Sequence, residues 1–458
     1  MRSTLLSPSD LPQEAQGSLV DVATHRGAVQ PEVRLFTFLG DGETETDSLT
    51  FGELDRRARA LAAELHRLGA SGRRVVLAYP SGLDFIVAFF GSLYAGAVAV
   101  PTVLPVGRRA LEILETLARD ARPEFVLTAA SQSAAIARQL AGLETRVASL
   151  QELHCGSNAD PTFEPRVSPD DLAMIQYTSG STGAPKGVML THTNLMHNQA
   201  VIFRHFQHDK TSGVVSWLPM FHDMGLIGTV MQPLYMGRPC TLMSPIHFIE
   251  RPARWLRAIT RYGATTSGAP NFAFDMCVNR IPSEDRVGLD LSRWDLAFNG
   301  SEPIRPGTLE RFTRSFAPQG FRPEAFYPCY GMAEATLFVS GGPKALAPVI
   351  RDADAGALEQ HRLGPAAAGA ETRAVVASGR PSEEQGVRIV DPDNRRTLPE
   401  CEIGEIWLRG PSVARATGVS LGRAGRPSRT GPPRATGPTS GPATSGVFRT
   451  ASSTSPAG

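Results

Sequence analysis

Lysine is almost missing from this chain of 458 residues. Of its 46 basic residues only three are lysines, at Lys186, Lys210 and Lys344, which leaves 43 arginines. A lysine kept in an arginine-rich chain indicates a role for a compact point charge, which the planar fork of arginine does not fill. Lys186 lies in a loop rich in glycine, serine and threonine, where such a charge would face an anion.

Cysteine and net charge are also scarce. The formal net charge is +1, which gives no support for binding to nucleic acid or to a membrane surface. The five cysteines are odd in number, scattered and without C-x-x-C spacing, which argues against a disulfide framework or a zinc site. They are Cys155, Cys240, Cys277, Cys329 and Cys401. We therefore expect a cytoplasmic protein with reduced thiols.

Long unbroken apolar runs are absent. Residues 1–8 contain no apolar segment of the kind that a signal peptide requires. Residues 85–106 are long enough to span a bilayer, but glycines and prolines interrupt them. A buried helix over 85–94 and a strand over 97–100 that ends at Pro101 explain them better, so we expect no transmembrane segment.

Acidic residues disappear after Glu405. At the frequency of the preceding residues, about six would be expected in the remaining 53. Residues 415–458 consist largely of glycine, proline, alanine, serine, threonine and arginine, cannot bury a core, and are expected to be disordered. Our hypothesis is a frameshift near residues 414–416 of a GC-rich gene; a natural low-complexity tail is the alternative.

The most informative stretch is residues 177–187, which lie between apolar runs at 172–175 and 188–190. Strand–loop–strand or strand–loop–helix is the expected arrangement. Glycines let backbone N–H groups turn toward an anion, and hydroxyls and an ammonium add donors, so the loop predicts a phosphate site. Its members are Thr178, Ser179, Gly180, Ser181, Thr182, Gly183 and Lys186. A flexible turn is the alternative, and the spacing is not that of a Walker A loop, which disfavours a P-loop NTPase.

Helices and strands alternate in the first third of the chain. A capping box at 50–53 opens a helix that ends at Gly69, and buried strands are expected at 74–80 and 125–128, with a helix at 111–119 between them. This β-α-β-α order predicts a doubly wound parallel sheet.

Polar residues follow a later strand. The strand expected at 213–218 is followed by His222 and Asp223, and open α/β sheets bind ligands at the carboxyl ends of their strands. A satisfied, half-buried histidine is the alternative. Further along, the apolar residues around Phe272 and Phe274 are either core or the wall of a pocket.

Two more strand–turn segments lie at 296–303 and 326–336. Gly300 would permit the backbone to approach a flat ring closely. Glu334 follows a glycine, where the simpler explanation is a solvated residue at a helix N-terminus.

The loop at 177–187, the aromatic/His segment at 217–228 and the two segments above occur in the order found in the adenylate-forming superfamily, and the resemblance covers about residues 30–412. Residues 84–101 and the stretch after Phe338 look like the fatty acyl-AMP ligase branch.

The resemblance implies an α/β fold, the large N-terminal domain of these enzymes. Such a domain has two doubly wound sheet subdomains and a small β-barrel subdomain, here with strands near 387–392 and 404–408. It would occupy residues 1–414, with an insertion at 338–379 that is thought to hinder reaction with CoA. The family would continue into a C-terminal lid domain that supplies a ribose-binding aspartate and a lysine; we expect it to be absent here and catalysis to be impaired.

The resemblance also implies roles for individual residues. Lys186, His222 and Glu334 would be catalytic, and Glu334 with Thr178 would hold Mg²⁺. Adenine would be bound by Gly300, Ser301, Glu302, Tyr330 and Gly331. The acyl group would be bound by His222, Asp223, Met224, Gly225, Gly268, Asn271 and Phe272.

The function implied is activation of a fatty acid with ATP and Mg²⁺ to an acyl-adenylate. The acyl group would pass to an acyl-carrier protein or a polyketide synthase carrier domain, in lipid or polyketide biosynthesis. An acyl-CoA synthetase and a catalytically inactive remnant that binds nucleotide or acyl groups are the alternatives. Acyl chain length, the carrier and the oligomeric state are left open.

Overall fold

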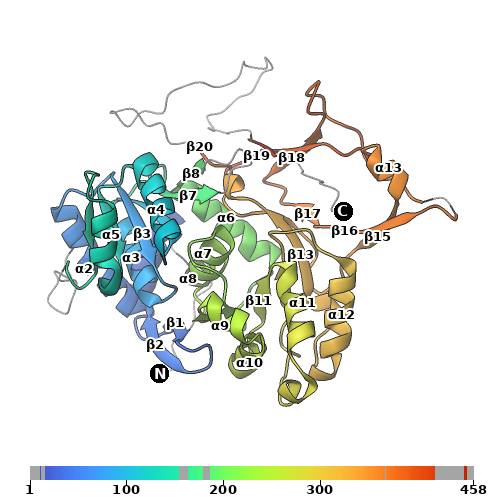
Figure 1. Ribbon diagram of the computed structural model, residues 1–458, viewed down its shortest axis with the longest axis horizontal. Coiled ribbons are helices and arrows are strands. Elements are labelled where there is room, and N and C mark those ends of the chain that lie inside the picture. Colours follow the sequence, from blue (N-terminus) through green and yellow to red (C-terminus); the bar gives the residue numbers. More distant parts are fainter. Residues whose placement is uncertain are drawn as a thin grey trace.

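The computed structural model describes residue 11 and residues 16–153, 163–178, 186–366, 368–417 and 448–450. Figure 1 shows two β-sheets with helices between and around them, and a smaller β region beside the second sheet. The helices are α1 (Leu19–Val29), α2 (Phe51–Arg67), α3 (Leu83–Tyr94), α4 (Arg108–Ala121), α5 (Ala130–Gln139), α6 (His192–His205), α7 (Asp223–Leu226), α8 (Gln232–Met236), α9 (Pro245–Glu250), α10 (Ala253–Tyr262), α11 (Asn271–Arg280), α12 (Pro306–Phe316) and α13 (Ala355–Glu359).

The first sheet has the strand order β20-β8-β7-β4-β3-β5-β6. Its strands are β3 (Arg74–Tyr79), β4 (Val98–Val103), β5 (Phe125–Thr128), β6 (Arg146–Ala148), β7 (Leu172–Thr178), β8 (Lys186–Thr191) and β20 (Ala416–Thr417). The strands from β7 to β6 are parallel, whereas β8 pairs with β7 antiparallel. The expected β-α-β-α order and the strand–loop–strand form of residues 172–191 are thus confirmed.

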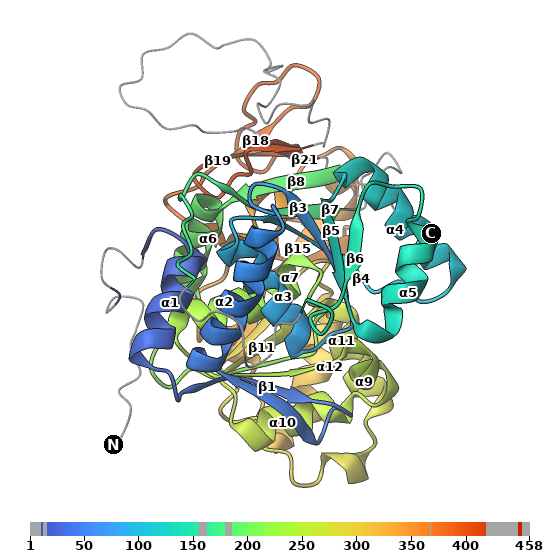
Figure 2. The same cartoon turned by 90° about the vertical axis from the view of Figure 1, so that its left-hand side faces the viewer.

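Alternating residues of β3 show that this sheet is covered on both faces. Val75 and Leu77 belong to the main core. Val76 and Ala78 belong to a second core that is built with α4 and α5, which lie on the outer face (Figure 2). The capping box that opens α2 forms as expected: the Thr50 hydroxyl accepts from the Glu53 amide, and the Glu53 carboxylate accepts from the Thr50 amide.

The second sheet has the order β17-β14-β13-β12-β11-β9-β10-β1-β2. Its strands are β1 (Arg34–Leu39), β2 (Glu45–Thr50), β9 (Val214–Ser216), β10 (Cys240–Met243), β11 (Thr266–Ala269), β12 (Leu296–Asn299), β13 (Phe326–Gly331), β14 (Phe338–Gly341) and β17 (Arg380–Pro381). The strands from β1 to β13 are parallel, and antiparallel strands close both ends.

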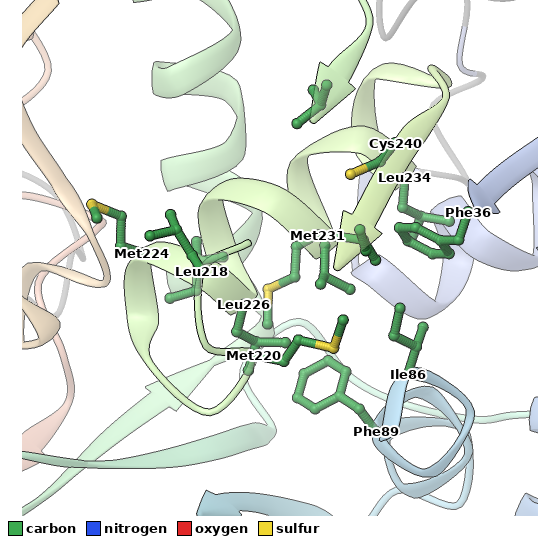
Figure 3. Close-up of a cluster of buried hydrophobic side chains, with 14 of the residues drawn as sticks. Phe36, Ile86, Phe89, Leu218, Met220, Met224, Leu226, Met231, Leu234 and Cys240 are labelled. Carbon is green, nitrogen blue, oxygen red and sulfur yellow. The ribbon is translucent and has the colours of Figure 1, made fainter. Parts of the chain in front are cut away.

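The two sheets share one hydrophobic core. In Figure 3, Phe36 of β1 lies near Ile86 and Phe89 of α3, and side chains such as Met231 fill the space around them. The helices of this middle layer therefore have apolar side chains on more than one face. Eleven of the twelve residues of α3 are buried. Burial on all sides explains why the sequence of residues 83–94 is almost continuously apolar.

One boundary differs from expectation. We expected a strand that ends at Pro101, but β4 continues through Pro101, which pairs with Leu77, to Val103. On its other side, β4 pairs with β7 at Ala99 and not at Pro101. The proline therefore interrupts no hydrogen bond between β4 and β7. Among the described helices, none combines the length and apolarity that a bilayer span requires.

The residues after β14, where we expected an insertion, form a hairpin and a small β region. β15 (Ile350–Asp354) and β16 (Thr372–Val376) make a hairpin that carries α13 and projects from the body (Figure 1). β18 (Gly386–Val390) and β19 (Glu405–Arg409) pair antiparallel, as expected, and β21 (Phe448–Thr450) adds a third strand. The described part of this region is an antiparallel sheet with the strand order β18-β19-β21. The tail expected at 415–458 contains β20 and β21; the rest of it lies outside the described residues.

Candidate active site

A cavity of about 180 Å³ lies at the carboxyl ends of β12 and β13 of the second sheet and the loop after β9. Parallel strands present their carboxyl ends at one edge, where open α/β sheets bind ligands. Residues expected to bind adenine and residues expected to bind the acyl group meet here. The lining residues are Ile202, Phe206, His222, Asp223, Met224, Gly228, Phe298, Gly300, Ser301, Cys329, Tyr330, Gly331, Leu337 and Phe338.

His222 and Asp223 form the polar side of this cavity. His222 Nδ1 lies 2.6 Å from Asp223 Oδ1 and 3.4 Å from the Met224 amide, which itself lies 2.6 Å from Asp223 Oδ1. One nitrogen cannot donate to the carboxylate and also accept from the amide, so the shorter contacts decide: Nδ1–H and the amide both donate to Asp223. The hydrogen bond to Asp223 raises the pKa of His222, although burial opposes this, and Nε2 remains available to a ligand.

The phosphate-loop hairpin is joined to this side of the cavity. Gln176 of β7 is buried, and its Nε2 donates to the Phe221 carbonyl at 2.9 Å. Thr178 ends β7 and Lys186 begins β8; these two residues pair across the hairpin, and both side chains are at least partly exposed. The other five expected phosphate-binding residues lie outside the described residues: Ser179, Gly180, Ser181, Thr182 and Gly183.

The loop after β12 carries the expected adenine-binding residues Gly300, Ser301 and Glu302. Ser301 has a φ of 68°, and its hydroxyl donates to the Met224 sulfur at 3.4 Å. The Glu302 carboxylate accepts a hydrogen bond of 2.5 Å from the Phe272 amide. Glu302 therefore faces the first turn of α11, and it is not among the residues that line the cavity.

Tyr330 and Gly331 end β13 and also line the cavity. A Cβ at Gly331 would lie 2.1 Å from the Leu337 carbonyl oxygen, so no other residue fits at this close approach of two strands. Glu334 follows in a short 3₁₀ turn at Ala333–Ala335, where it is partly exposed. Its backbone carbonyl accepts from the Ala414 amide at 2.8 Å.

Comparison with known proteins identifies the family of this chain. Residues 24–416 match the family model described as AMP-binding enzyme. The chain belongs to the family of AMP-binding enzymes. It is 41% identical over 409 residues to the medium-chain-fatty-acid–[acyl-carrier-protein] ligase JamA of Moorena producens (strain JHB), over 87% of this chain and 69% of JamA.

Other relatives agree. The long-chain-fatty-acid–AMP ligase FadD23 of Mycobacterium tuberculosis (strain CDC 1551 / Oshkosh) is 37% identical over 84% of this chain and 68% of its own length. The chain thus spans about two thirds of the length of these relatives. A solved fatty acyl-adenylate ligase from L. pneumophila, in complex with acyl adenylate and pyrophosphate, has a TM-score of 0.82 at 40% identity, over 90% of this chain and 72% of that one. This AMP-binding enzyme therefore groups with the fatty acyl-AMP ligases.

Of four residues expected to bind the acyl group, three have packing roles in this AMP-binding enzyme and the fourth is exposed. A Cβ at Gly225 would lie 2.1 Å from the Pro219 carbonyl oxygen, and one at Gly268 would lie 2.2 Å from that of Phe298. Asn271 is buried; its Nδ2 donates to Thr308 Oγ1 at 3.1 Å, and its Oδ1 accepts from the Arg305 amide at 3.1 Å. Phe272 is 40% exposed. None of the four is among the residues that line the 180 Å³ cavity, and their assignment to the acyl site stays a prediction.

The apolar wall of the cavity was not anticipated. It consists of Ile202 of α6, Phe206 at the C-cap of α6, Gly228, Phe298, Leu337 and Phe338. One signal for it was present. Ile202 and Phe206 are four residues apart, a spacing that places both side chains on one face of a helix. Cys329 also lines the cavity, and burial raises its pKa to about 12, which keeps the thiol neutral.

The described residues could bind Mg²⁺ together with a nucleotide, but they do not form a complete metal site by themselves. No group of three or more His, Cys, Asp or Glu side chains in the described ranges could hold a metal ion by itself. Glu334, for whose carboxylate the described residues provide no recorded ion pair or hydrogen bond, offers a single ligand. Mg²⁺ is commonly bound by one or two carboxylates together with water and substrate phosphates, so Glu334 suits a metal–nucleotide complex.

Proposed function

We propose that this chain activates a fatty acid with ATP. The carboxylate attacks the α-phosphorus, a new O–P bond forms, the bond to pyrophosphate breaks, and acyl-adenylate remains bound. The observation that supports this most is that one cavity is lined by His222 and Asp223, by Ser301 and Tyr330, and by apolar side chains. Acyl-adenylate combines the same three parts: a polar acyl phosphate, a flat base and an alkyl chain.

Different residues of the cavity bind the adenine and the acyl carboxylate. Gly300, Ser301, Tyr330 and Gly331 bind adenine, and Glu302 fixes their loop. His222 lies beside the acyl carboxylate with Nδ1–H held by Asp223. Because Asp223 raises the pKa of His222, the ring gains positive charge more readily and attracts the carboxylate.

The loop from Thr178 to Lys186 holds the departing pyrophosphate. The Lys186 ammonium is a donor to the negative charge that accumulates on the pyrophosphate. Glu334 and Thr178 would hold Mg²⁺ together with the phosphates, and the metal would supply further charge neutralisation. This AMP-binding enzyme then passes the acyl group to the thiol of an acyl-carrier protein or a polyketide synthase carrier domain, in the cytoplasm, in lipid or polyketide biosynthesis. JamA and FadD23 are named for medium and long chains, so chain length stays open.

The test is ATP–pyrophosphate exchange with fatty acids of increasing length. We expect exchange that depends on a fatty acid and on Mg²⁺. Lys186→Ala should lower the rate by about 10²–10³, the usual cost of losing one donor to developing charge. Lys344→Ala is the matched control, because the Lys344 ammonium bonds the Gln207 carbonyl away from the cavity and its loss should leave the rate unchanged.

Two outcomes would contradict the proposal. Binding of ATP without any exchange would identify a nucleotide-binding protein that does not activate acids. Exchange followed by transfer to CoA in preference to a carrier-protein thiol would identify an acyl-CoA synthetase. Both are measured with the same protein, the first by calorimetry and the second by mass spectrometry of the acceptor.

A further inference from the structure

A short segment, residues 410–414, crosses the back of the turn that carries Glu334. We call it the crossing segment. Ser412 and Ala414 are fully buried, and Val413 is 6% exposed. The crossing segment forms hydrogen bonds with α6. It also forms hydrogen bonds with the turn from Ala333 to Phe338.

Asn198 of α6 joins the turn and the crossing segment. Its Oδ1 accepts from the Phe338 amide at 3.0 Å, and its Nδ2 lies 3.0 Å from the Phe338 carbonyl and 3.0 Å from Ser412 Oγ. The Asn198 side chain has no exposed surface. Unmade hydrogen bonds are costly at a buried position, so this amide fixes the end of the turn.

Ser412 connects Asn198 to His197. His197 Nε2 lies 2.8 Å from Glu384 Oε2, and its Nδ1 lies 2.7 Å from Ser412 Oγ. Burial lowers the pKa of His197, which favours the neutral ring with a single proton. That proton is on Nε2 and donates to Glu384, so Nδ1 accepts from the Ser412 hydroxyl. Ser412 Oγ in turn accepts a hydrogen bond from Asn198 Nδ2. Asn198, Ser412, His197 and Glu384 thus form a continuous series of hydrogen bonds in which every donor has an acceptor.

The turn itself is strained. Thr336 has a φ of 70°, a conformation that is rare and unfavourable for a β-branched residue. Its hydroxyl donates to the Ser412 carbonyl at 2.6 Å. Two residues away, the Ala414 amide donates to the Glu334 carbonyl at 2.8 Å. The crossing segment therefore holds both Thr336 and Glu334 in place.

The same segment reaches the phosphate-loop hairpin. Directly after it, Ala416 pairs with Met189 of β8, the strand that begins at Lys186. One stretch of chain is thus bonded to the turn that carries Glu334 and to the strand that carries Lys186.

We infer that Ser412, Asn198 and Thr336 are positioning residues that hold Glu334 for a divalent metal–nucleotide complex. The inference rests on the proposed function, since it takes Glu334 as a metal ligand. Residues that orient a metal ligand typically contribute 10–100-fold to metal affinity or activity. None of the three need touch the substrate for its loss to have this effect.

The experiment measures Mn²⁺ binding with ATP by electron paramagnetic resonance, since carboxylates bind Mn²⁺ and Mg²⁺ alike. We expect Ser412→Ala to weaken Mn²⁺ binding in the presence of ATP by about 10–100-fold and to raise the Mg²⁺ concentration for half-maximal exchange equally. Gln199→Ala is the matched control: Gln199 is a buried neighbour on α6 whose Nε2 bonds the Ile227 carbonyl at 3.1 Å, away from the crossing segment. It should leave Mn²⁺ binding unchanged.

A second pair of variants separates the loss of a hydrogen bond from misfolding of the protein. Thr336→Ala removes the hydroxyl, whereas Thr336→Ser keeps it. We expect the metal affinity to fall for the first and to be restored for the second. Equal Mn²⁺ affinity in the wild type, Ser412→Ala and Thr336→Ala overturns the inference alone. Lack of fatty-acid-dependent exchange in the wild type overturns the proposed function, while Mn²⁺–ATP binding still reports on the positioning.

Discussion

At the scale of single residues, Asp223 sets the state of His222. The Asp223 carboxylate receives both the imidazole Nδ1–H and the Met224 amide. It therefore fixes the tautomer of the ring and raises its pKa. Through these two bonds the position of one carboxylate determines which nitrogen faces the cavity.

This arrangement predicts the effect of Asp223→Asn. We expect the pKa of His222 to fall, because the charged partner is lost while burial, which opposes protonation, remains. A pH titration of the histidine ring protons by NMR measures the shift, and His222→Gln assigns the signal. An unchanged or higher pKa would show that Asp223 does not determine the protonation of the ring.

Residues also differ in how well they can be predicted. His222, Gly300, Ser301, Tyr330 and Gly331 were all expected at the site and line one cavity, because each lies at or after the carboxyl end of a strand and belongs to a recognisable motif. The apolar wall was missed, because a leucine or phenylalanine that faces a cavity has the same sequence pattern as one that faces the core. Only the tertiary arrangement of α6 and β12 separates the two.

At the scale of elements, α11 depends on a residue from another loop. Its own N-cap position is Pro270, which provides no side-chain acceptor, and the Glu302 carboxylate accepts from the Phe272 amide instead. An acceptor at a helix N-terminus satisfies one of its free amides and interacts favourably with the helix dipole. The adenine loop and α11 are therefore held together.

We expect Glu302→Ala to lower the free energy of unfolding by about 1 kcal/mol, the usual value of an N-terminal cap, and to raise the KM for ATP. Urea denaturation and exchange kinetics measure the two effects. Glu310→Ala is the control, since Glu310 is an exposed glutamate that pairs with Arg314 one turn along α12, and such pairs contribute little. If both variants behave alike, Glu302 does not serve as a cap.

Element boundaries were the least predictable part of the fold. The sequence located β5 at 125–128 correctly, because short apolar runs between turn residues admit few alternatives. It expected a strand followed by a turn over 296–303, and β12 occupies the first four of these residues. It placed the end of β4 too early, because proline is normally a stop signal. It gave no sign that β1 pairs with β10, since strand order in a sheet depends on packing between distant segments.

At the scale of the whole molecule, buried neutral histidines link stability to pH. Burial lowers the pKa of His208 to about 3 and that of His192 to about 4. Lys344 lowers the pKa of His208 further and Asp209 opposes it; Asp171 opposes the shift at His192. In the unfolded chain both rings take up protons near pH 6.5, so between about pH 4 and 6.5 the unfolded state binds more protons. Their stabilising contribution is complete above pH 6.5 and declines as the pH falls.

We expect the free energy of unfolding to drop between pH 7 and pH 5, by about 2 kcal/mol for each of the two histidines. Urea denaturation at a series of pH values measures it. His208→Gln keeps hydrogen-bonding groups toward Gln232 and Thr266 but does not titrate, so its pH profile should be flatter than that of the wild type. Identical profiles would show that His208 does not contribute.

The pairing of β1 with β10 also has a consequence for synthesis on the ribosome. Phe36 pairs with Cys240, so the two partners are separated by 204 positions (240 − 36) along the chain. At about 5–20 residues per second, the first strand waits about 10–40 s for its partner to be made. During that time β2 can protect one edge of β1, and the other edge stays open. The nascent chain therefore carries an unpaired, apolar strand edge for longer than most folding steps last, and its yield in a cell depends on what shields that edge.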